Sequence, residues 1–262
     1  MASSEQTGHA VYDPDNSGTK QEGSKWDISY GDGSGASGTV YADKVVVGGV
    51  TATSQAVEAA TSVSTSFTQD VDNDGLLDLA NFPLAYDFGG IIESRYTGDI
   101  AYVDVDTTNG FWEFQPSGFA VGDGETQTSL SIDAIADTGT TLLYLPEDVV
   151  SAYYEQVQDA EYSSNYGGYI FPCSADLPSF SLIIGDAKRT VSGDYINYAP
   201  AGSGTCFGGI QRDTGIGFSI IGDIFLKSQY VIFDASTATP RLGWAQQATS
   251  SSSSSNSTSG IF

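Results

Sequence analysis

The chain has 262 residues, of which 40% are hydrophobic and 16% are charged, so it is long and apolar enough to fold around a sizeable core. Its 33 acidic and 9 basic residues give a formal net charge of −24, and so negative a surface repels phosphate backbones and excludes nucleic acid as a partner. No apolar run is long enough to cross a membrane, which excludes a membrane-spanning helix.

The N-terminal part of the chain predicts a long β-hairpin. Trp26, Ile28 and Tyr30 alternate with polar residues, which is the periodicity of a strand. Residues 31–35 read Gly-Asp-Gly-Ser-Gly, a turn sequence, and residues 40–47 return to a strand-like run. We therefore expect two antiparallel strands joined by residues 31–35.

Further along the chain, short strand-like runs are separated by turns, and one helix is expected. Pro146, Glu147 and Asp148 open this helix with the proline and the acids favoured in a first turn, and it continues through 149–157. The serine-rich tail, residues 248–262, has too few apolar groups to pack and is expected to be disordered. The expected strands are 91–92, 100–105, 110–114, 132–136, 169–171, 180–184 and 230–233.

An Asp-Thr-Gly triplet at Asp137 is the main candidate for chemistry. It stands between apolar runs at 132–136 and 142–145. A tight turn between buried strands would desolvate its carboxylate and hold it with backbone donors, which makes a tunable acid. The triplet alone is a weak signal, because a second one begins at Asp213. That second triplet follows polar residues and lacks the threonine that succeeds the first, so we expect a surface turn there.

A second segment supports Asp137. Residues 220–226 read Ile-Ile-Gly-Asp-Ile-Phe-Leu, which is an apolar pair, a glycine and a run expected to be a strand. Gly222 has no Cβ, so two chain segments can cross there. Taken alone, the segment also fits a buried strand with a bend.

The two cysteines, Cys173 and Cys206, lie far apart and lack a Cys-x-x-Cys spacing, which favours one disulfide over a metal site. His9 is the only histidine and lies in a polar loop. A zinc cluster is therefore not expected. Neither is a serine or cysteine hydrolase, which needs a histidine base.

Together these motifs resemble the pepsin family of aspartic proteases, with its fungal members of the endothiapepsin and penicillopepsin type most similar. The similarity covers most of residues 1–247. Residues 26–38 resemble the flap of the family, and 63–68 and 74–77 resemble the end of its N-terminal lobe. The blocks that resemble its C-terminal lobe are 137–146, 220–226, 230–234 and 242–244.

The resemblance implies an all-β, bilobal pepsin-like acid protease fold, with an incomplete N-terminal lobe at 1–80 and a nearly complete C-terminal lobe at 81–247. It implies an endopeptidase in which two aspartates, one per lobe, share a proton and hold the water that attacks the peptide bond at acid pH. No metal or cofactor takes part. The implied protein is a secreted monomer that acts on proteins and peptides, although residues 1–20 contain no signal peptide. The strong acidity fits work in acid, and it fits equally a secreted protein that is merely kept soluble.

The resemblance also assigns roles to individual residues. Asp137 matches the second catalytic aspartate. The implied disulfide joins Cys173 and Cys206. The implied substrate-binding residues are Tyr30, Gly31 and Asp32 at the flap tip, Phe67 in an apolar subsite, and Gly139, Thr140 and Thr141 beside the aspartate.

Three departures from the family bear on catalysis. No Asp-Thr-Gly-Ser loop precedes the flap, Asp78 stands where the family has glycine, and Ala80 leads almost directly to Tyr86, where the family interposes helices and strands. Without a second carboxyl group, Asp137 has no partner with which to share a proton, so we expect little or no peptide hydrolysis by this chain. A truncated or mis-spliced gene and a naturally inactive paralogue both explain the departures. Lost strands would expose sheet edges and apolar faces, so we also expect the chain to express poorly or aggregate.

Two other functions fit parts of the sequence. Residues 70–81 open like an EF-hand calcium loop, with Asp78 at the ninth position, but the twelfth is Asn81 and no flanking helix pair is expected. A non-catalytic peptide-binding protein is the other alternative, because the flap and the C-lobe half of the cleft are retained. A homodimer that pairs two copies of Asp137 is disfavoured, since the remaining N-lobe segments would obstruct it.

Overall fold

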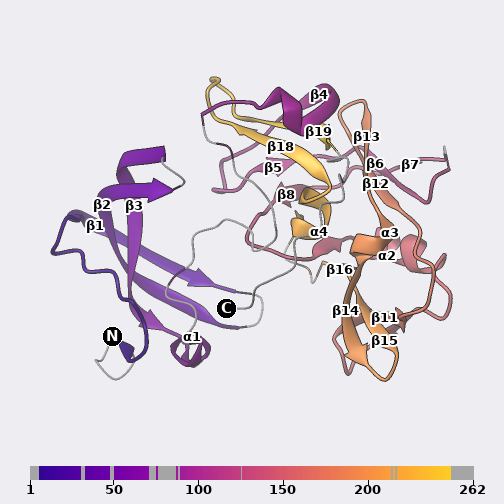
Figure 1. The fold of residues 1–262 in the computed structure, drawn as a ribbon, viewed down its shortest axis with the longest axis horizontal. Coiled ribbons are helices and arrows are strands. Elements are labelled where there is room, and N and C mark those ends of the chain that lie inside the picture. The colour runs from indigo at the N-terminus through magenta and orange to yellow at the C-terminus, as the bar shows by residue number, and fades with distance from the viewer. Residues whose placement is uncertain are drawn as a thin grey trace, which may run out of the picture. The chain divides into compact units, whose positions relative to one another are not determined.

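A computed structural model describes residues 6–30, 33–47, 50–70, 75, 87, 89–124, 126–213, 215 and 217–248. The chain divides into two compact units, Met1–Leu77 and Asp78–Phe262. Strands predominate in both units, with short helices between them (Figure 1), which confirms the predicted all-β class. Residues 249–262 lie outside the described residues, so the disorder of the serine-rich tail stays a prediction.

Three long antiparallel strands form the sheet of the N-terminal unit, in the order β1–β2–β3. The predicted hairpin is confirmed, because β1 pairs with β2 and places Trp26 opposite Gly38. The elements of this unit are β1 (Thr19–Ser29), β2 (Gly35–Val47), β3 (Val50–Val63) and the short helix α1 (Thr65–Gln69).

Asp43 on β2 anchors the N-terminal loop of this unit. It is a buried residue, and its carboxylate accepts hydrogen bonds from the hydroxyls of Tyr12 and Ser17, both at 2.8 Å. The hydrogen bond from Ser17 makes the largest contribution and that from Tyr12 the next, and together they hold the pKa of Asp43 below its ordinary value. Burial, followed by the bond to Asp43, raises the pKa of Tyr12 to about 12. The Tyr12 ring also packs edge-on against Tyr41, with centroids 6.3 Å apart.

The N-terminal unit has little core. Among its described residues no hydrophobic side chain is fully buried, and Val46 and Val50 are 55% and 47% exposed. A small sheet needs an apolar face packed against something to be stable by itself. Hydrophobic burial therefore stabilises this unit far less than the C-terminal one.

We expect the backbone amides of β1–β3 to exchange with solvent much faster than those of the buried strands in the C-terminal unit, because local opening exposes almost no new apolar surface. Native-state hydrogen exchange read by mass spectrometry measures both units in one sample. Equal protection in the two units would contradict this expectation. The same exposed faces are the reason to expect aggregation of the chain.

The C-terminal unit contains the remaining regular elements. Its helices are η2 (Glu93–Arg95), α2 (Glu147–Tyr154), α3 (Gly193–Ile196) and α4 (Asp223–Leu226). Its strands are β4 (Tyr96–Asp104), β5 (Glu113–Phe114), β6 (Gly118–Val121), β7 (Thr128–Ser129), β8 (Ala134–Ala136), β9 (Leu143–Leu145), β10 (Glu161–Ser163), β11 (Gly168–Pro172), β12 (Phe180–Ile184), β13 (Ala187–Val191), β14 (Asn197–Gly202), β15 (Thr205–Gly208), β16 (Ile210–Arg212), β17 (Ser219–Ile221), β18 (Gln229–Asp234) and β19 (Arg241–Gln247).

These strands form four sheets. A five-stranded mixed sheet runs β16–β9–β17–β8–β5, and two four-stranded sheets run β13–β12–β6–β7 and β10–β11–β15–β14. A three-stranded sheet runs β18–β19–β4. In the mixed sheet β8 lies parallel to β17, with Ala136 opposite Ile221. The residues that follow these two strands, Asp137 and Gly222, therefore leave the sheet side by side.

The hydrophobic core of the chain lies in this unit. Trp244 is fully buried and packs against Phe114 and Phe225, with ring centroids 5.2 and 6.2 Å apart. Leu143 and Leu145 on β9 are also fully buried, so the strand that follows the Asp137 turn is fixed in the core. Burial of each such side chain stabilises the fold by about 1.5–3 kcal/mol.

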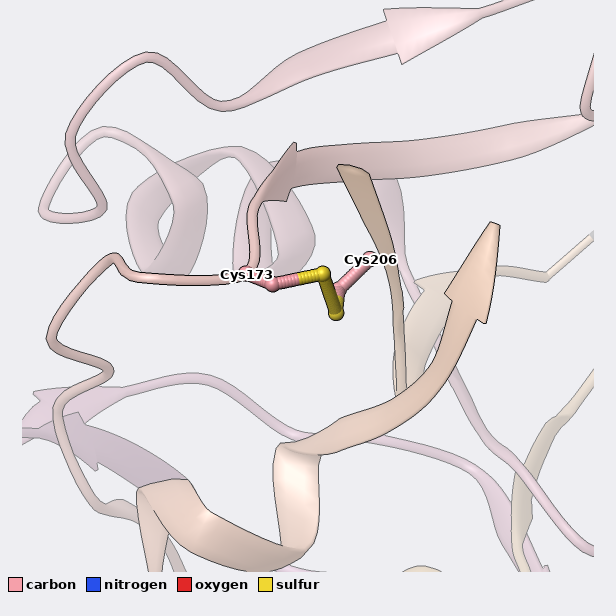
Figure 2. Close-up of a disulfide and its surroundings, with 2 residues drawn as sticks. All are labelled: Cys173 and Cys206. Atoms are coloured by element: carbon pink, nitrogen blue, oxygen red, sulfur yellow. A yellow bond between two sulfur atoms is a disulfide. The ribbon is translucent and has the colours of Figure 1, made fainter. Parts of the chain in front are cut away.

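A disulfide joins Cys173, directly after β11, to Cys206 on β15 (Figure 2), as expected. It links two neighbouring strands of the β10–β11–β15–β14 sheet, where Phe171 lies opposite Cys206. Cys206 is buried within the core, and Cys173 packs against the core from a partly buried position.

Several sequence expectations need correction. Residues 91–92 are irregular, and of 110–114 only the last two form a strand. The helix opened by Pro146, Glu147 and Asp148 has Pro146 as its N-cap, as expected for its start, but it ends at Tyr154 and not at Val157. The run after Gly222 is the helix α4 and not a strand. All of these segments are short, so hydrophobic periodicity has too few residues to distinguish a turn of helix from a strand.

The β18–β19 hairpin contains a carboxylate with a pH-dependent contribution to stability. Asp234 accepts hydrogen bonds from the Ser236 amide and hydroxyl and, at 2.8 Å, from the Arg241 Nε. The Ser236 hydroxyl, then Arg241, lower the pKa of Asp234 to about 2. Because its pKa is lower in the folded state, the Asp234 carboxylate stabilises the fold at pH values above the ordinary aspartate pKa. This contribution is lost as the pH falls through the folded-state pKa.

Asp234→Asn is therefore expected to lower the melting temperature near neutral pH and to change it little below about pH 2, where the wild-type carboxyl is protonated. Thermal melts of both proteins across that range measure the difference. A constant difference at all pH values would show that charge on Asp234 does not contribute.

No helix in the described part of the chain has the length and apolar character needed to pass through a bilayer.

Candidate active site

Asp137 lies in the turn between β8 and β9. The three residues of β8 are buried, and β9 enters the core immediately after the turn. The Asp137 amide donates to the Ile221 carbonyl at 3.1 Å, which ties the start of the turn to β17. The backbone beneath the carboxylate is thus held on both sides by buried strands.

The carboxylate of Asp137 is oriented by two donors from its own turn. The Gly139 amide donates to Oδ1 at 2.9 Å, and the Thr140 hydroxyl donates to Oδ2 at 2.6 Å. Both donors satisfy the charged form and leave further lone pairs on each oxygen available to a water or a substrate. Asp137 itself is half-buried and not fully desolvated, which corrects the stronger burial expected from its apolar flanks.

Thr140 and Thr141 also connect the turn to α4. The Thr140 carbonyl accepts from the Asp223 amide at 2.8 Å, and the Thr141 carbonyl accepts from the Ile224 amide at 2.9 Å. Thr140 therefore binds the aspartate with its side chain and α4 with its backbone. The sequence interpretation missed this helix, although an acidic residue directly after glycine is a favourable first-turn signal.

Gly222 lies where the two segments cross, as predicted. A Cβ at this position would come within 2.3 Å of both the Thr140 and the Leu142 carbonyl oxygens, and both are backbone atoms. The glycine is therefore required by close approach, because its φ of −90° is open to any residue.

Gly222→Ala is expected to lower the free energy of unfolding by about 1–3 kcal/mol, because the new methyl group displaces the backbone that carries Thr140. Urea denaturation measures the loss. Gly90→Ala is a matched control in the same unit, since nothing lies within 4 Å of its Cβ position. Equal stability of the two variants would contradict the close approach of the two backbone segments at Gly222.

The second triplet has different surroundings. Asp213 directly follows β16, and its carboxylate accepts from the Ser219 hydroxyl at 3.1 Å, while its amide donates to the Leu145 carbonyl. Asp213 is half-buried, whereas Gly215 is exposed with a φ of +77°, as in a turn. Thr214 lies outside the described residues. The two triplets are thus distinguished by what holds each carboxylate.

The candidate flap residues belong to the N-terminal unit. At the hairpin tip the Tyr30 amide donates to the Ser34 carbonyl at 2.8 Å. The Tyr30 ring packs edge-on against Phe67, with centroids 5.7 Å apart, so the structure brings these two predicted residues together. Gly31 and Asp32 lie outside the described residues. The position of this tip over Asp137 stays a prediction, because the two belong to different units.

The calcium alternative stays a prediction, because most of residues 70–81 lie outside the described part of the chain. Within the described part, no group of three or more His, Cys, Asp or Glu side chains is arranged to hold a metal ion.

Comparison with known proteins gives a consistent result. The family model of eukaryotic aspartyl proteases matches residues 1–86 and 82–247. Aspergillopepsin-1 from Aspergillus pseudoglaucus is 52% identical over 280 residues, which cover 94% of this chain and 71% of that protein. Penicillopepsin-3 from Penicillium janthinellum is 51% identical over 283 residues, with the same two coverages. Since 94% of 262 residues is fewer than 280, the relatives carry positions without a counterpart here.

Proposed function

This chain belongs to the eukaryotic aspartyl protease family, whose members are aspartic endopeptidases, and from that membership we propose that Asp137 is one of the two carboxyl groups that catalyse peptide hydrolysis. The observation that carries the proposal is the bonding of its carboxylate. The Gly139 amide and the Thr140 hydroxyl each hold one oxygen of Asp137 at a turn fixed by buried strands.

The chemistry requires a pair. Two carboxyl groups facing one water cannot both be ionised, so their pKa values separate. The ionised member takes a proton from the attacking water, and the protonated member donates a proton toward the peptide carbonyl. Asp137 provides one member, and in the mechanism of this family the other comes from the N-terminal lobe. No metal or cofactor enters these steps.

The substrate is an extended segment of a protein or peptide. Tyr30, Gly31 and Asp32 close over it as the flap, and Phe67, which contacts Tyr30, lines an apolar subsite. Gly139, Thr140 and Thr141 meet its backbone beside Asp137. We place the protein outside the cell as a monomer, which is what its resemblance to the family implies.

A lobe exchange tests the role of Asp137. Residues 81–247 of this chain replace the matching half of aspergillopepsin-1 from Aspergillus pseudoglaucus, so that the relative supplies a complete N-terminal lobe. The chimera is expected to cleave a protein substrate at acid pH, whereas the 262 residues alone are expected to show no measurable cleavage. A folded but inactive chimera would refute the proposal.

A second candidate function is peptide binding without hydrolysis, favoured by the single Asp-Thr-Gly-Thr motif in this sequence. Fluorescence anisotropy of a labelled peptide with the 262-residue chain tests it. Saturable binding without cleavage supports this function, and no binding at micromolar protein excludes it.

A further inference from the structure

A pocket in the C-terminal unit is lined by the middle of β4, by the turn between β12 and β13, and by β13. Its volume is about 290 Å³, enough for a molecule the size of an amino acid or a dipeptide. Every lining residue belongs to this one unit, and Asp137 is not among them. The lining consists of Asp99, Ile100, Ala101, Tyr102, Gly185, Asp186, Ala187 and Arg189.

Arg189 gives the pocket an unusual donor. This arginine is only 7% exposed, although arginine is almost never fully buried without a partner of opposite charge. One terminal nitrogen donates to the Trp244 carbonyl at 2.6 Å and, at 3.4 Å, to the Asp99 carbonyl. The Nε is buried and has no hydrogen-bond partner. No carboxylate in the described part of the chain forms an ion pair with Arg189.

A buried cation with an unused N–H is costly unless an acceptor reaches it. Burial lowers the pKa of Arg189, yet a guanidinium stays charged in proteins. An acceptor that is itself negative, such as a carboxylate, would make the strongest hydrogen bond with it. Arg189, which lines the pocket with its guanidinium, therefore favours a carboxylate ligand.

The two carboxylates in the lining have the opposite preference. Asp99 and Asp186 line the pocket and are exposed. They belong to a chain with a formal net charge of −24, so a simple anion is repelled on its approach. A ligand that is positive at one end and negative at the other satisfies both the arginine and the two carboxylates.

We propose that this pocket binds a small zwitterion, a free amino acid or a short peptide, with its carboxylate at Arg189 and its ammonium group at Asp99 and Asp186. The site is separate from the candidate active site and does not depend on the proposed function. It would give the protein a means of sensing free amino acids or peptide fragments in its surroundings.

Side-chain Nε–H resonances in ¹H–¹⁵N spectra of the full chain test the proposal directly. The sequence has four arginines, so the Arg189 resonance is assigned by its loss in Arg189→Lys, or through backbone connectivity if that variant does not fold. The probes are glycylglycine, acetate and ethylamine. Glycylglycine is expected to shift the Arg189 resonance saturably and to bind at least about tenfold more tightly than acetate.

Asp186→Asn is expected to weaken glycylglycine binding several-fold and not to weaken acetate binding. Asp176→Asn, which removes an exposed carboxylate outside the pocket, should leave both unchanged. Failure of glycylglycine to move the Arg189 resonance in the folded protein overturns the site. Equal affinity for acetate and glycylglycine, with no effect of Asp186→Asn, overturns the zwitterionic ligand.

Discussion

Asp137→Asn in the lobe chimera is expected to lower kcat for peptide hydrolysis by about four powers of ten or more, because an amide neither accepts nor releases the shared proton. The substitution preserves size, so the turn should keep its hydrogen bond from the Gly139 amide, now to the amide oxygen. The loss should therefore appear in kcat and not in the melting temperature. Initial rates at acid pH and thermal melts of the same preparations separate the two effects.

Asp213→Asn is the matched control, because Asp213 begins the other Asp-Thr-Gly triplet of the chain. Its carboxylate accepts from the Ser219 hydroxyl, whereas the Asp137 carboxylate accepts from Gly139 and Thr140 of its own turn. The control is expected to keep kcat within about twofold of the chimera. Comparable losses in both variants, or full activity in Asp137→Asn, would assign the chemistry elsewhere.

The context of Asp137 could be predicted because burial leaves a signal in sequence. Apolar residues on both sides of the triplet indicate strands that enter the core, and Ile135 and Leu143 do so. A glycine between apolar residues indicates a close approach of backbones, which Gly222 makes. The hydrogen bond from the Thr140 hydroxyl depends on a turn geometry that follows only once both flanking strands are placed.

The helix α4 could not be predicted from periodicity. All four of its residues are buried, so no polar face marks its direction, and four residues give barely one turn. Its amides donate to the Thr140 and Thr141 carbonyls, and those acceptors lie more than eighty residues earlier in the chain. Such a helix forms because the tertiary structure offers it partners, which local sequence does not report.

The burial of Arg189 could not be predicted from the sequence either. In sequence it is one basic residue in a polar stretch between Lys188 and Thr190, which suggests a solvated strand. The antiparallel pairing with β12 turns its side chain inward, and β19 supplies the Trp244 carbonyl. Which of two adjacent cations is buried depends on strand register, and a shift of one residue would exchange them.

Replacing both cysteines by alanine is expected to destabilise the chain by about 3–4 kcal/mol. The bridge joins residues 33 positions apart. Closing a loop of that length lowers the entropy of the unfolded state, and at room temperature this is equivalent to roughly 3–4 kcal/mol of stability. Loss of packing adds to the effect, since Cys206 is buried within the core. Urea denaturation of the wild type and the double variant Cys173→Ala with Cys206→Ala measures the difference.

Reduction of the wild-type protein separates the two contributions, because it opens the loop but leaves both sulfur atoms in place. If loop entropy dominates, reduced wild type and the double alanine variant should have nearly equal stabilities, both well below that of the oxidised protein. If packing dominates, the reduced wild type should stay close to the oxidised one. If the reduced wild type and the double variant each lose less than about 1 kcal/mol, the segments of β11 and β15 must stay close together in the denatured chain without the bridge, through residual structure.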